Sequence, residues 1–222
     1  MTYDGLLLDF DGVVVSVLRD EKRLPSFQAA IDGQFGEANV GIDDAVIETL
    51  AHSVSPETLS SLSNRTGIPQ ETLWRYRDDA LANVLCRAAR EGTKTPYADV
   101  GTLTDLDVPV GIASNNQRRV IESILETHEL SDYFETIRAR EPTPASLQRK
   151  KPEPTYLEEA MADLTLTNPL YVGDKESDVL AGRRAGLDTA LIRREHNATR
   201  EIATDPTVHV WDLGEVVGLF EG

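Results

Sequence analysis

Two carboxylates spaced by one residue, Asp9 and Asp11, follow the short apolar run 6–8 near the start of the chain. A run of this length is typical of a strand buried on both faces of a parallel sheet, and ligands gather where such strands end. Side chains alternate along extended backbone, so Asp9 and Asp11 could point the same way while Phe10 turns into the core. Two acids this close repel each other, which predicts a cation or a positively charged partner.

Three further polar clusters follow apolar runs or lie in loops later in the chain. They are Ser114-Asn115, Lys151-Pro152 and Gly173-Asp174 with Asp178. A hydroxyl and an amide where a strand enters a helix, as at Ser114 and Asn115, are suited to hold phosphoryl oxygens, and a plain N-cap is the structural alternative. Asp178 likewise either serves a metal site or is a helix-start acid favoured by the dipole.

In type and order these four clusters resemble the motifs of the haloacid dehalogenase superfamily of phosphotransferases, over essentially the whole chain. The resemblance implies an α/β fold, a doubly wound parallel sheet of Rossmann-like form with an inserted helical cap. Members similar to phosphoglycolate phosphatase have such a cap. We therefore expect the clusters to meet at one edge of the sheet.

The resemblance also implies the role of each motif. Asp9 is the expected nucleophile, because a carboxylate can form an aspartyl-phosphate intermediate. Asp11 is expected to protonate the leaving alkoxide and then to take a proton from the hydrolytic water. Lys151 would neutralise Asp9 and the phosphoryl group. Lys150 is adjacent, but the Lys-Pro-x-Pro setting favours Lys151.

Magnesium is the expected cofactor, because Mg²⁺ prefers oxygen ligands and shares the phosphate oxygens of substrates. The predicted protein ligands are the Asp9 carboxylate, the backbone carbonyl of Asp11 and the Asp174 carboxylate. Asp178 is predicted either to bind the ion or to orient its bound water.

The residues at and around the motifs narrow the range of reactions that the resemblance implies. An acid at Asp11 is what the phosphatases and phosphomutases of the superfamily have, whereas its dehalogenases and phosphonatases lack one. Val13 stands where many members carry threonine, and Lys175 replaces a common small hydroxyl residue. We interpret Lys175 as a solvated loop lysine. The four histidines have no metal-ligand spacing and are expected to be structural or exposed.

The elements that position these residues alternate between strand and helix, outside one long helical stretch. The predicted core comprises 1–15 and 93–222, and the predicted cap comprises 16–92. Strands are predicted over 108–113, 134–139, 170–172, 189–192 and 208–211; core helices over 118–129 and 154–164, with one ending near Gly186; cap helices over 43–51, from Pro56, and over 69–90. The helix content of 25–40 stays open.

Charge is the unusual global property of the 222 residues, with 38 Asp and Glu against 22 Lys and Arg and a net charge of −16. Such a surface repels nucleic acid and anionic membranes. A lysine-poor acidic composition suits molar salt, where charges are screened within about 3 Å. We expect a halophilic origin, which thermal melts in rising KCl would test. The single cysteine, Cys86, excludes an internal disulfide framework.

No apolar run reaches the roughly 18 residues that span a bilayer, and we expect a cytoplasmic protein. The predicted protein is a Mg²⁺-dependent phosphatase that acts on a small phosphorylated metabolite. Phosphoglycolate-like esters are the first choice of substrate. A phosphomutase of the β-phosphoglucomutase kind is the alternative, and a non-catalytic binding protein on the same fold is another. Both monomer and homodimer remain open.

Overall fold

The computed structural model describes residues 3–37, 42–52 and 54–221, and the chain divides into two compact units. Unit 1 consists of Met1–Val17, Thr95–Arg140 and Arg149–Gly222, and unit 2 of Leu18–Lys94 and Glu141–Gln148. The sequence prediction assigned 141–148 to the core, whereas by its contacts this segment groups with unit 2. Among the described residues, no helix combines the length and apolarity needed to cross a bilayer.

Unit 1 is built on a six-stranded sheet in the order β3-β2-β1-β4-β5-β6, and every pairing is parallel. The strands are β1 (Leu6–Leu8), β2 (Val110–Gln117), β3 (Thr136–Arg140), β4 (Leu170–Gly173), β5 (Thr189–Ile192) and β6 (Val208–Val210). The central strand β1 is completely buried, as its unbroken apolar run requires in a sheet covered on both faces. The predicted doubly wound parallel sheet is confirmed.

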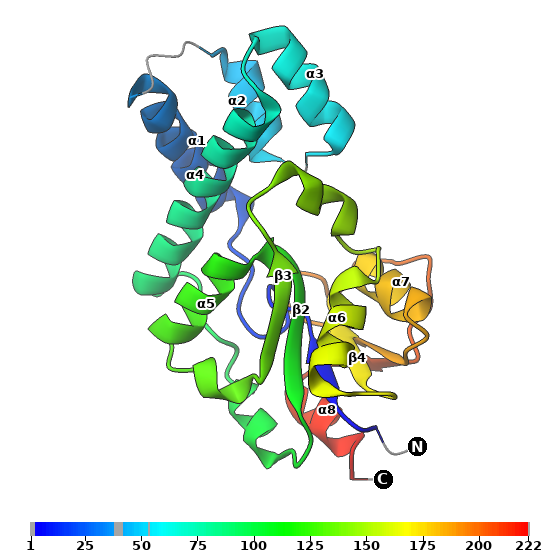
Figure 1. Ribbon diagram of the computed structural model, residues 1–222. Helices are drawn as coiled ribbons and strands as arrows, with labels where there is room; N and C mark the ends of the chain where they lie inside the picture. The colour runs from blue at the N-terminus through cyan, green and yellow to red at the C-terminus, as the bar shows by residue number, and fades with distance from the viewer. Residues whose placement is uncertain (1–2, 38–41, 53, 222) are drawn as a thin grey trace. The chain divides into compact units, whose positions relative to one another are not determined.

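Helices cover both faces of this sheet. They are η1 (Val100–Asp105), α5 (Arg118–Thr127), η2 (Ser131–Tyr133), α6 (Thr155–Leu164), α7 (Glu176–Arg184) and α8 (Leu213–Gly218). Figure 1 shows α5 on one side of the strands and α6 and α7 on the other, as right-handed crossovers demand. Tyr156, Leu157 and Ala160 of α6 pack with Leu7 and Ala113 of the sheet in a buried cluster. The terminal helix α8 was not predicted.

Unit 2 is helical, with α1 (Asp20–Glu37), α2 (Asp44–Ala51), α3 (Pro56–Thr66) and α4 (Gln70–Arg90); the turn η3 (Pro144–Arg149) begins in its second segment. A side chain caps the amino-terminal end of both α2 and α3. Asp43 accepts a hydrogen bond from the Val46 amide, and Ser55 accepts one from the Thr58 amide. The long helix α4 packs against α1 and α3.

The chain leaves unit 1 and returns to it through two adjacent segments. The Ser16 amide donates to the Thr95 carbonyl over 2.8 Å, and the Thr95 amide donates to Ser16 Oγ over 3.0 Å. Just before this junction, the Gly12 amide donates to the Val15 carbonyl over 2.7 Å and closes the turn that follows Asp11. The insertion therefore begins within a few residues of the predicted catalytic acids.

Candidate active site

Three neighbouring strands deliver acidic and hydroxyl side chains to one edge of the sheet. Leu8, the last residue of β1, is in register with Ile112 of β2 and with Val172 of β4. Because the strands are parallel, the residues just beyond these paired positions lie together at the carboxyl end of β1. Asp9, Ser114 and Asp174 therefore gather within unit 1, and all three side chains are buried.

Lys151 lies at the centre of this group and is itself buried. Its Nζ lies 3.0 Å from Asp9 Oδ1 and 2.6 Å from Asp178 Oδ1, and it donates to the Ala113 carbonyl over 3.0 Å. Burial alone would lower the pKa of Lys151, but the charges of Asp178 and Asp9 outweigh it and raise that pKa above its ordinary value. The ammonium is therefore a fixed positive charge between two carboxylates.

Tyr171 is a member of the site that sequence reasoning missed. Its hydroxyl accepts from Lys151 Nζ over 2.7 Å and donates to Asp178 Oδ1 over 3.2 Å. Burial, followed by the charges of Asp178 and Asp9, raises the pKa of Tyr171 well above 10, so the phenol stays neutral. In the sequence it stands inside an apolar strand, where an aromatic residue is ordinarily part of the core.

The Asp9 carboxylate is buried yet held in its ionised form. Burial would raise its pKa, but the charges of Lys151 and Lys175, together with hydrogen bonds from Ser114 and Lys151, lower it below the ordinary value of 3.8. An ionised carboxylate with little bound water is the state that a carboxylate nucleophile needs.

Asp11 lies beside Asn116, whose Nδ2 donates to Asp11 Oδ2 over 2.6 Å. The Asn116 backbone amide also donates to Ser114 Oγ over 3.3 Å. The strand that was predicted to end at Ala113 continues in the structure, as β2, to Gln117. Alternation along this extension puts Ser114 and Asn116 on the same side of the strand, and Asn116 was not among the predicted site residues.

Asn115 is engaged with the lysine segment. Its Nδ2 donates to the Lys151 carbonyl over 3.1 Å, and its Oδ1 accepts from the Lys151 amide over 2.7 Å. Both polar atoms of this side chain therefore fix the backbone of Lys151. Phosphoryl binding by Asn115 remains a prediction. A phosphoryl oxygen needs a hydrogen-bond donor, and the side-chain amide can offer the second N–H of Nδ2, which these two bonds do not use.

Asp178 is surrounded by donors. Besides Lys151 and Tyr171 on Oδ1, its Oδ2 accepts from the Asp174 amide over 3.2 Å and from the Lys175 amide over 3.0 Å. These bonds satisfy backbone donors at the start of α7. A Cβ on Gly173 would lie 2.1 Å from the Asp178 Cβ, so only glycine fits there. Asp178 thus organises the loop and the lysine together.

Asp174 is held by side chains that were not among the predicted site residues. Lys175 Nζ lies 3.0 Å from Asp174 Oδ1, so the interpretation of Lys175 as merely a solvated loop lysine was wrong: its side chain is partly exposed, but its ammonium pairs with a buried acid. His196 Nε2 lies 2.7 Å from Asp174 Oδ2, and Asn197 Nδ2 donates to the Asp174 carbonyl over 2.8 Å. His196 and Asn197 belong to the loop after β5, and no spacing in the sequence indicates that this loop reaches Asp174.

Gly12 allows the first strand to approach Asp174 closely. Its φ of +89° lies in the left-handed region, and a Cβ there would lie 2.4 Å from Asp174 Oδ2. Any side chain at this position would push into the carboxylate.

The donor set fits a hard divalent cation. Oxygen atoms of Asp9, Asp174 and Asp178 lie within 4.8 Å of one another, and all three residues are buried. Three buried carboxylates with only oxygen donors match the preference of Mg²⁺. The structure brings all the predicted side chains, Asp9, Asp11, Ser114, Asn115, Lys151, Asp174 and Asp178, into one contact network in unit 1.

Comparisons with known proteins agree with this arrangement. A family model described as haloacid dehalogenase-like hydrolase matches residues 44–192. A phosphoglycolate phosphatase of Rhodobacter capsulatus is 26% identical over 233 aligned residues, which cover 99% of this chain and 94% of that protein. A pyrophosphatase, PpaX of Anoxybacillus flavithermus, is 31% identical over 115 residues, covering 49% of this chain and 52% of that protein. A phosphoglycolate phosphatase of Pseudomonas fluorescens Pf0-1 aligns over only 40% of its own length.

Solved structures share the fold at low sequence identity. CbbY of Rhodobacter sphaeroides, crystallised with phosphate, superposes with a TM-score of 0.67 at 15% identity, covering 97% of this chain and 96% of that one. A subfamily IA hydrolase of Geobacter sulfurreducens gives a TM-score of 0.61 at 17% identity, covering 98% of this chain and 96% of that one.

Proposed function

The chain belongs to the haloacid dehalogenase-like hydrolases, and from this premise we propose that it is a Mg²⁺-dependent phosphatase of small phosphate monoesters that works through an aspartyl-phosphate intermediate. The observation that carries the proposal is the buried Asp9 carboxylate, kept ionised by Lys151 at 3.0 Å and surrounded by further acids.

In the first step an Asp9 carboxylate oxygen attacks the phosphorus, a P–O bond to Asp9 forms and the ester P–O bond breaks. Negative charge is spread over the phosphoryl oxygens in the transition state, so fixed positive charge nearby is the main requirement. Lys151 supplies it without rearrangement, because Asp178, Tyr171 and the Ala113 carbonyl already hold the ammonium in place.

Asp11 is the proposed proton carrier. It gives its proton to the leaving alkoxide, and it then removes a proton from the water that attacks the phosphorus of the Asp9 phosphate. This second step returns free Asp9 and releases inorganic phosphate. The hydrogen bond from Asn116 to one carboxylate oxygen of Asp11 restricts how the carboxyl group can rotate and so orients it for these transfers.

Asp9, Asp174 and the backbone carbonyl of Asp11 are the groups that would hold Mg²⁺, with Asp178 beside them. The ion, when bound, would neutralise charge on the phosphoryl group and orient it toward Asp9. Asp178 also keeps Lys151 and the Asp174 backbone in position through its hydrogen bonds.

We propose a phosphoglycolate-like ester as the substrate, supported by the names of the relatives that align over nearly the whole chain. In this proposal unit 2 is the cap that selects the substrate. It is inserted directly after the Asp11 turn, at the Ser16–Thr95 junction. A cytoplasmic location is part of the same proposal.

Hydrolysis of p-nitrophenyl phosphate with Mg²⁺ or with EDTA tests the reaction, and a panel of phosphorylated metabolites tests the substrate. Asp9→Asn is expected to lower kcat by about 10⁴-fold, with the fold retained by circular dichroism. Asp105→Asn, an exposed aspartate of unit 1, is the matched control and is expected to keep activity.

Acid quenching during turnover should trap phosphate on the wild-type protein and none on Asp9→Asn. Turnover by Asp9→Asn at the wild-type rate would falsify the nucleophile assignment. Conversion of glucose 1-phosphate to glucose 6-phosphate, without free phosphate, would replace the phosphatase by a mutase.

A further inference from the structure

Each carboxylate oxygen of Asp174 lies close to a basic side chain. Lys175 Nζ lies 3.0 Å from Oδ1, and His196 Nε2 lies 2.7 Å from Oδ2. The Asp174 side chain is fully buried, whereas the Lys175 side chain is 43% exposed. Lys175 therefore reaches inward from the solvent and places its ammonium on a buried acid that would also serve a divalent ion.

The two partners of Asp174 differ in how firmly they are held. The His196 ring is also within 3.4 Å of the Tyr97 hydroxyl through Nδ1, and its side chain is only 22% exposed. Lys175 carries its ammonium on a flexible four-carbon stem that can withdraw into solvent. Oδ1 is therefore the oxygen that an incoming cation can free most easily.

The charge around Lys175 explains why its ammonium stays there. Partial burial would lower its pKa, but the charges of Asp174, Asp9, Asp178 and Asp11 outweigh burial and hold that pKa above the usual lysine range. The same acids attract a divalent cation. An ammonium and a divalent ion that approach the same carboxylates repel each other strongly in a partly buried site.

We propose that the Lys175 ammonium competes with the divalent cation for Asp174, so that Lys175 sets how tightly the site binds Mg²⁺. Metal-free protein keeps the acidic cluster partly neutralised by Lys175, and binding of the ion displaces that ammonium from Asp174 Oδ1. Lys175 is here a positioning residue that acts on the metal site through Asp174. This inference rests on the metal role in the proposed function.

The test measures Mg²⁺ binding to the whole protein by titration calorimetry, without substrate. Lys175→Gln removes the competing charge and keeps a polar side chain of similar length, and we expect Mg²⁺ to bind about tenfold more tightly. Lys175→Arg keeps the charge and is expected to bind within about twofold of wild type.

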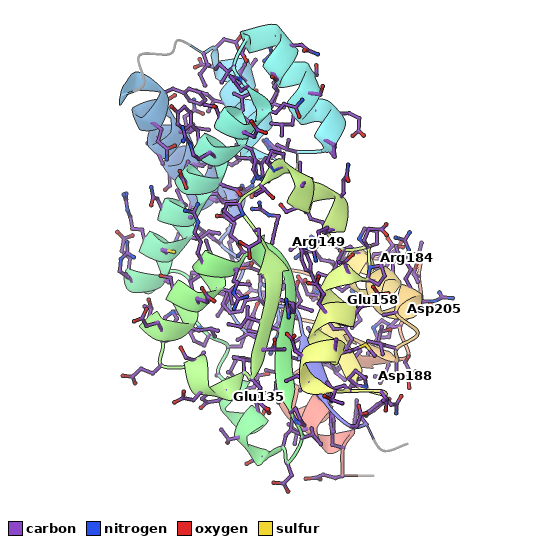
Figure 2. The ribbon with its side chains drawn as sticks, viewed as in Figure 1. Glu135, Arg149, Glu158, Arg184, Asp188 and Asp205 are labelled. Atoms are coloured by element: carbon purple, nitrogen blue, oxygen red, sulfur yellow. The ribbon has the colours of Figure 1, made fainter. Side chains whose placement is uncertain are left out.

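Arg184→Gln is the matched control, because it removes one positive charge from the other end of α7 (Figure 2), where Arg184 pairs with Glu153. It is expected to leave Mg²⁺ affinity within about twofold, since exposed charges more than about 10 Å away are screened in 0.1 M salt. If both Gln variants bind Mg²⁺ more tightly than wild type, the effect comes from net charge alone, and a specific role for Lys175 is overturned.

Thermal melts with EDTA and with Mg²⁺ give a second readout. Without metal, the melting temperature of Lys175→Gln should be lower than that of wild type. Added Mg²⁺ should raise the melting temperature of Lys175→Gln more than that of wild type, because tighter binding stabilises the folded state more. Mg²⁺ binding by wild type, with equal or weaker binding by Lys175→Gln, overturns the inference and leaves the proposed function standing. Absence of binding in both proteins overturns the metal proposal as well, whereas binding gained only by Lys175→Gln supports the competition.

Discussion

Asn116 Nδ2 and Asp11 Oδ2 are joined by a 2.6 Å hydrogen bond across 105 residues of chain. An amide that donates to one oxygen of a carboxylate restricts the rotation of the carboxyl group and so orients it. The contact depends on the extension of β2 to Gln117, which carries Asn116 past the end of β1.

Asn116→Ala is expected to lower kcat about tenfold with little change in KM, because Asp11 loses orientation rather than substrate contact. Steady-state kinetics on p-nitrophenyl phosphate measure both constants. Asn64→Ala, an exposed asparagine of α3, serves as the control and should leave both unchanged. A KM effect alone would show that Asn116 contacts substrate instead.

Gly12→Ala is expected to remove most activity and to destabilise the protein by about 1–3 kcal/mol, since the new Cβ combines a φ of +89° with a 2.4 Å approach to Asp174 Oδ2. Gly67→Ala separates the cost of the positive φ from the effect of the clash with Asp174. Gly67 also has a positive φ, of +73°, but no atom lies within 4 Å of the added carbon. It should cost roughly 1 kcal/mol and leave kcat intact. Urea unfolding and initial rates give the comparison.

Lys151→Met is expected to abolish activity and to lower the free energy of unfolding by about 3–5 kcal/mol, because Asp9 and Asp178 become buried charges without their shared partner. Lys150→Met makes the same change at the preceding residue. It should remain within about 0.5 kcal/mol of wild type and keep activity. Equal losses in both variants would show that the segment, rather than the Lys151 ammonium, is what matters.

Asp163 gives a pH-dependent prediction outside the site. Hydrogen bonds from Arg138 and Thr136 lower the pKa of Asp163 from 3.8 to about 2. Because the pKa of Asp163 is lower in the folded than in the unfolded state, its ionised carboxylate stabilises the folded protein above about pH 4. That stabilisation is lost as the pH falls through about 2. Because the pair is partly exposed, Asp163→Asn should be less stable by only about 1 kcal/mol at pH 6.

The measurement compares urea unfolding of wild type and Asp163→Asn from pH 6 downward. The difference between the two proteins should be constant above about pH 4.5 and shrink below pH 4. A difference that grows on acidification would show that the carboxyl is stabilised in its protonated form.

The residues that could be predicted are those for which local pattern and global position agree. Asp9, Ser114 and Asp174 each come directly after an apolar run, and parallel pairing brings such positions together whatever the intervening chain does. Lys151 depended on family resemblance, because nothing in its own segment places it against Asp9.

Tyr171, Lys175 and His196 could not be predicted for three different reasons. Tyr171 stands in a buried strand, where only the arrival of Lys151 gives its hydroxyl a role. Lys175 looks solvated in sequence, and its orientation follows from the acids that surround it. His196 lies in a loop whose path depends on long-range contacts such as that of Asn197 with the Asp174 carbonyl.

The assignment of 141–148 was missed because the sequence marks this segment only as a loop. The segment follows β3 directly, and Pro142 and Pro144 indicate a break in regular structure without indicating which unit the segment joins. Only contacts made in three dimensions assign it to the helical unit.

The central position of β1 has a consequence for how the protein is made. Its neighbours on the two sides lie far along the chain, because Leu6 pairs with Val110 on β2 and with Leu170 on β4, and both are synthesised after it. Until then an entirely apolar strand has two unsatisfied edges, which invites pairing with other chains. Both edges of β1 are therefore satisfied only after Leu170 has been synthesised, so the centre of the sheet forms late in folding.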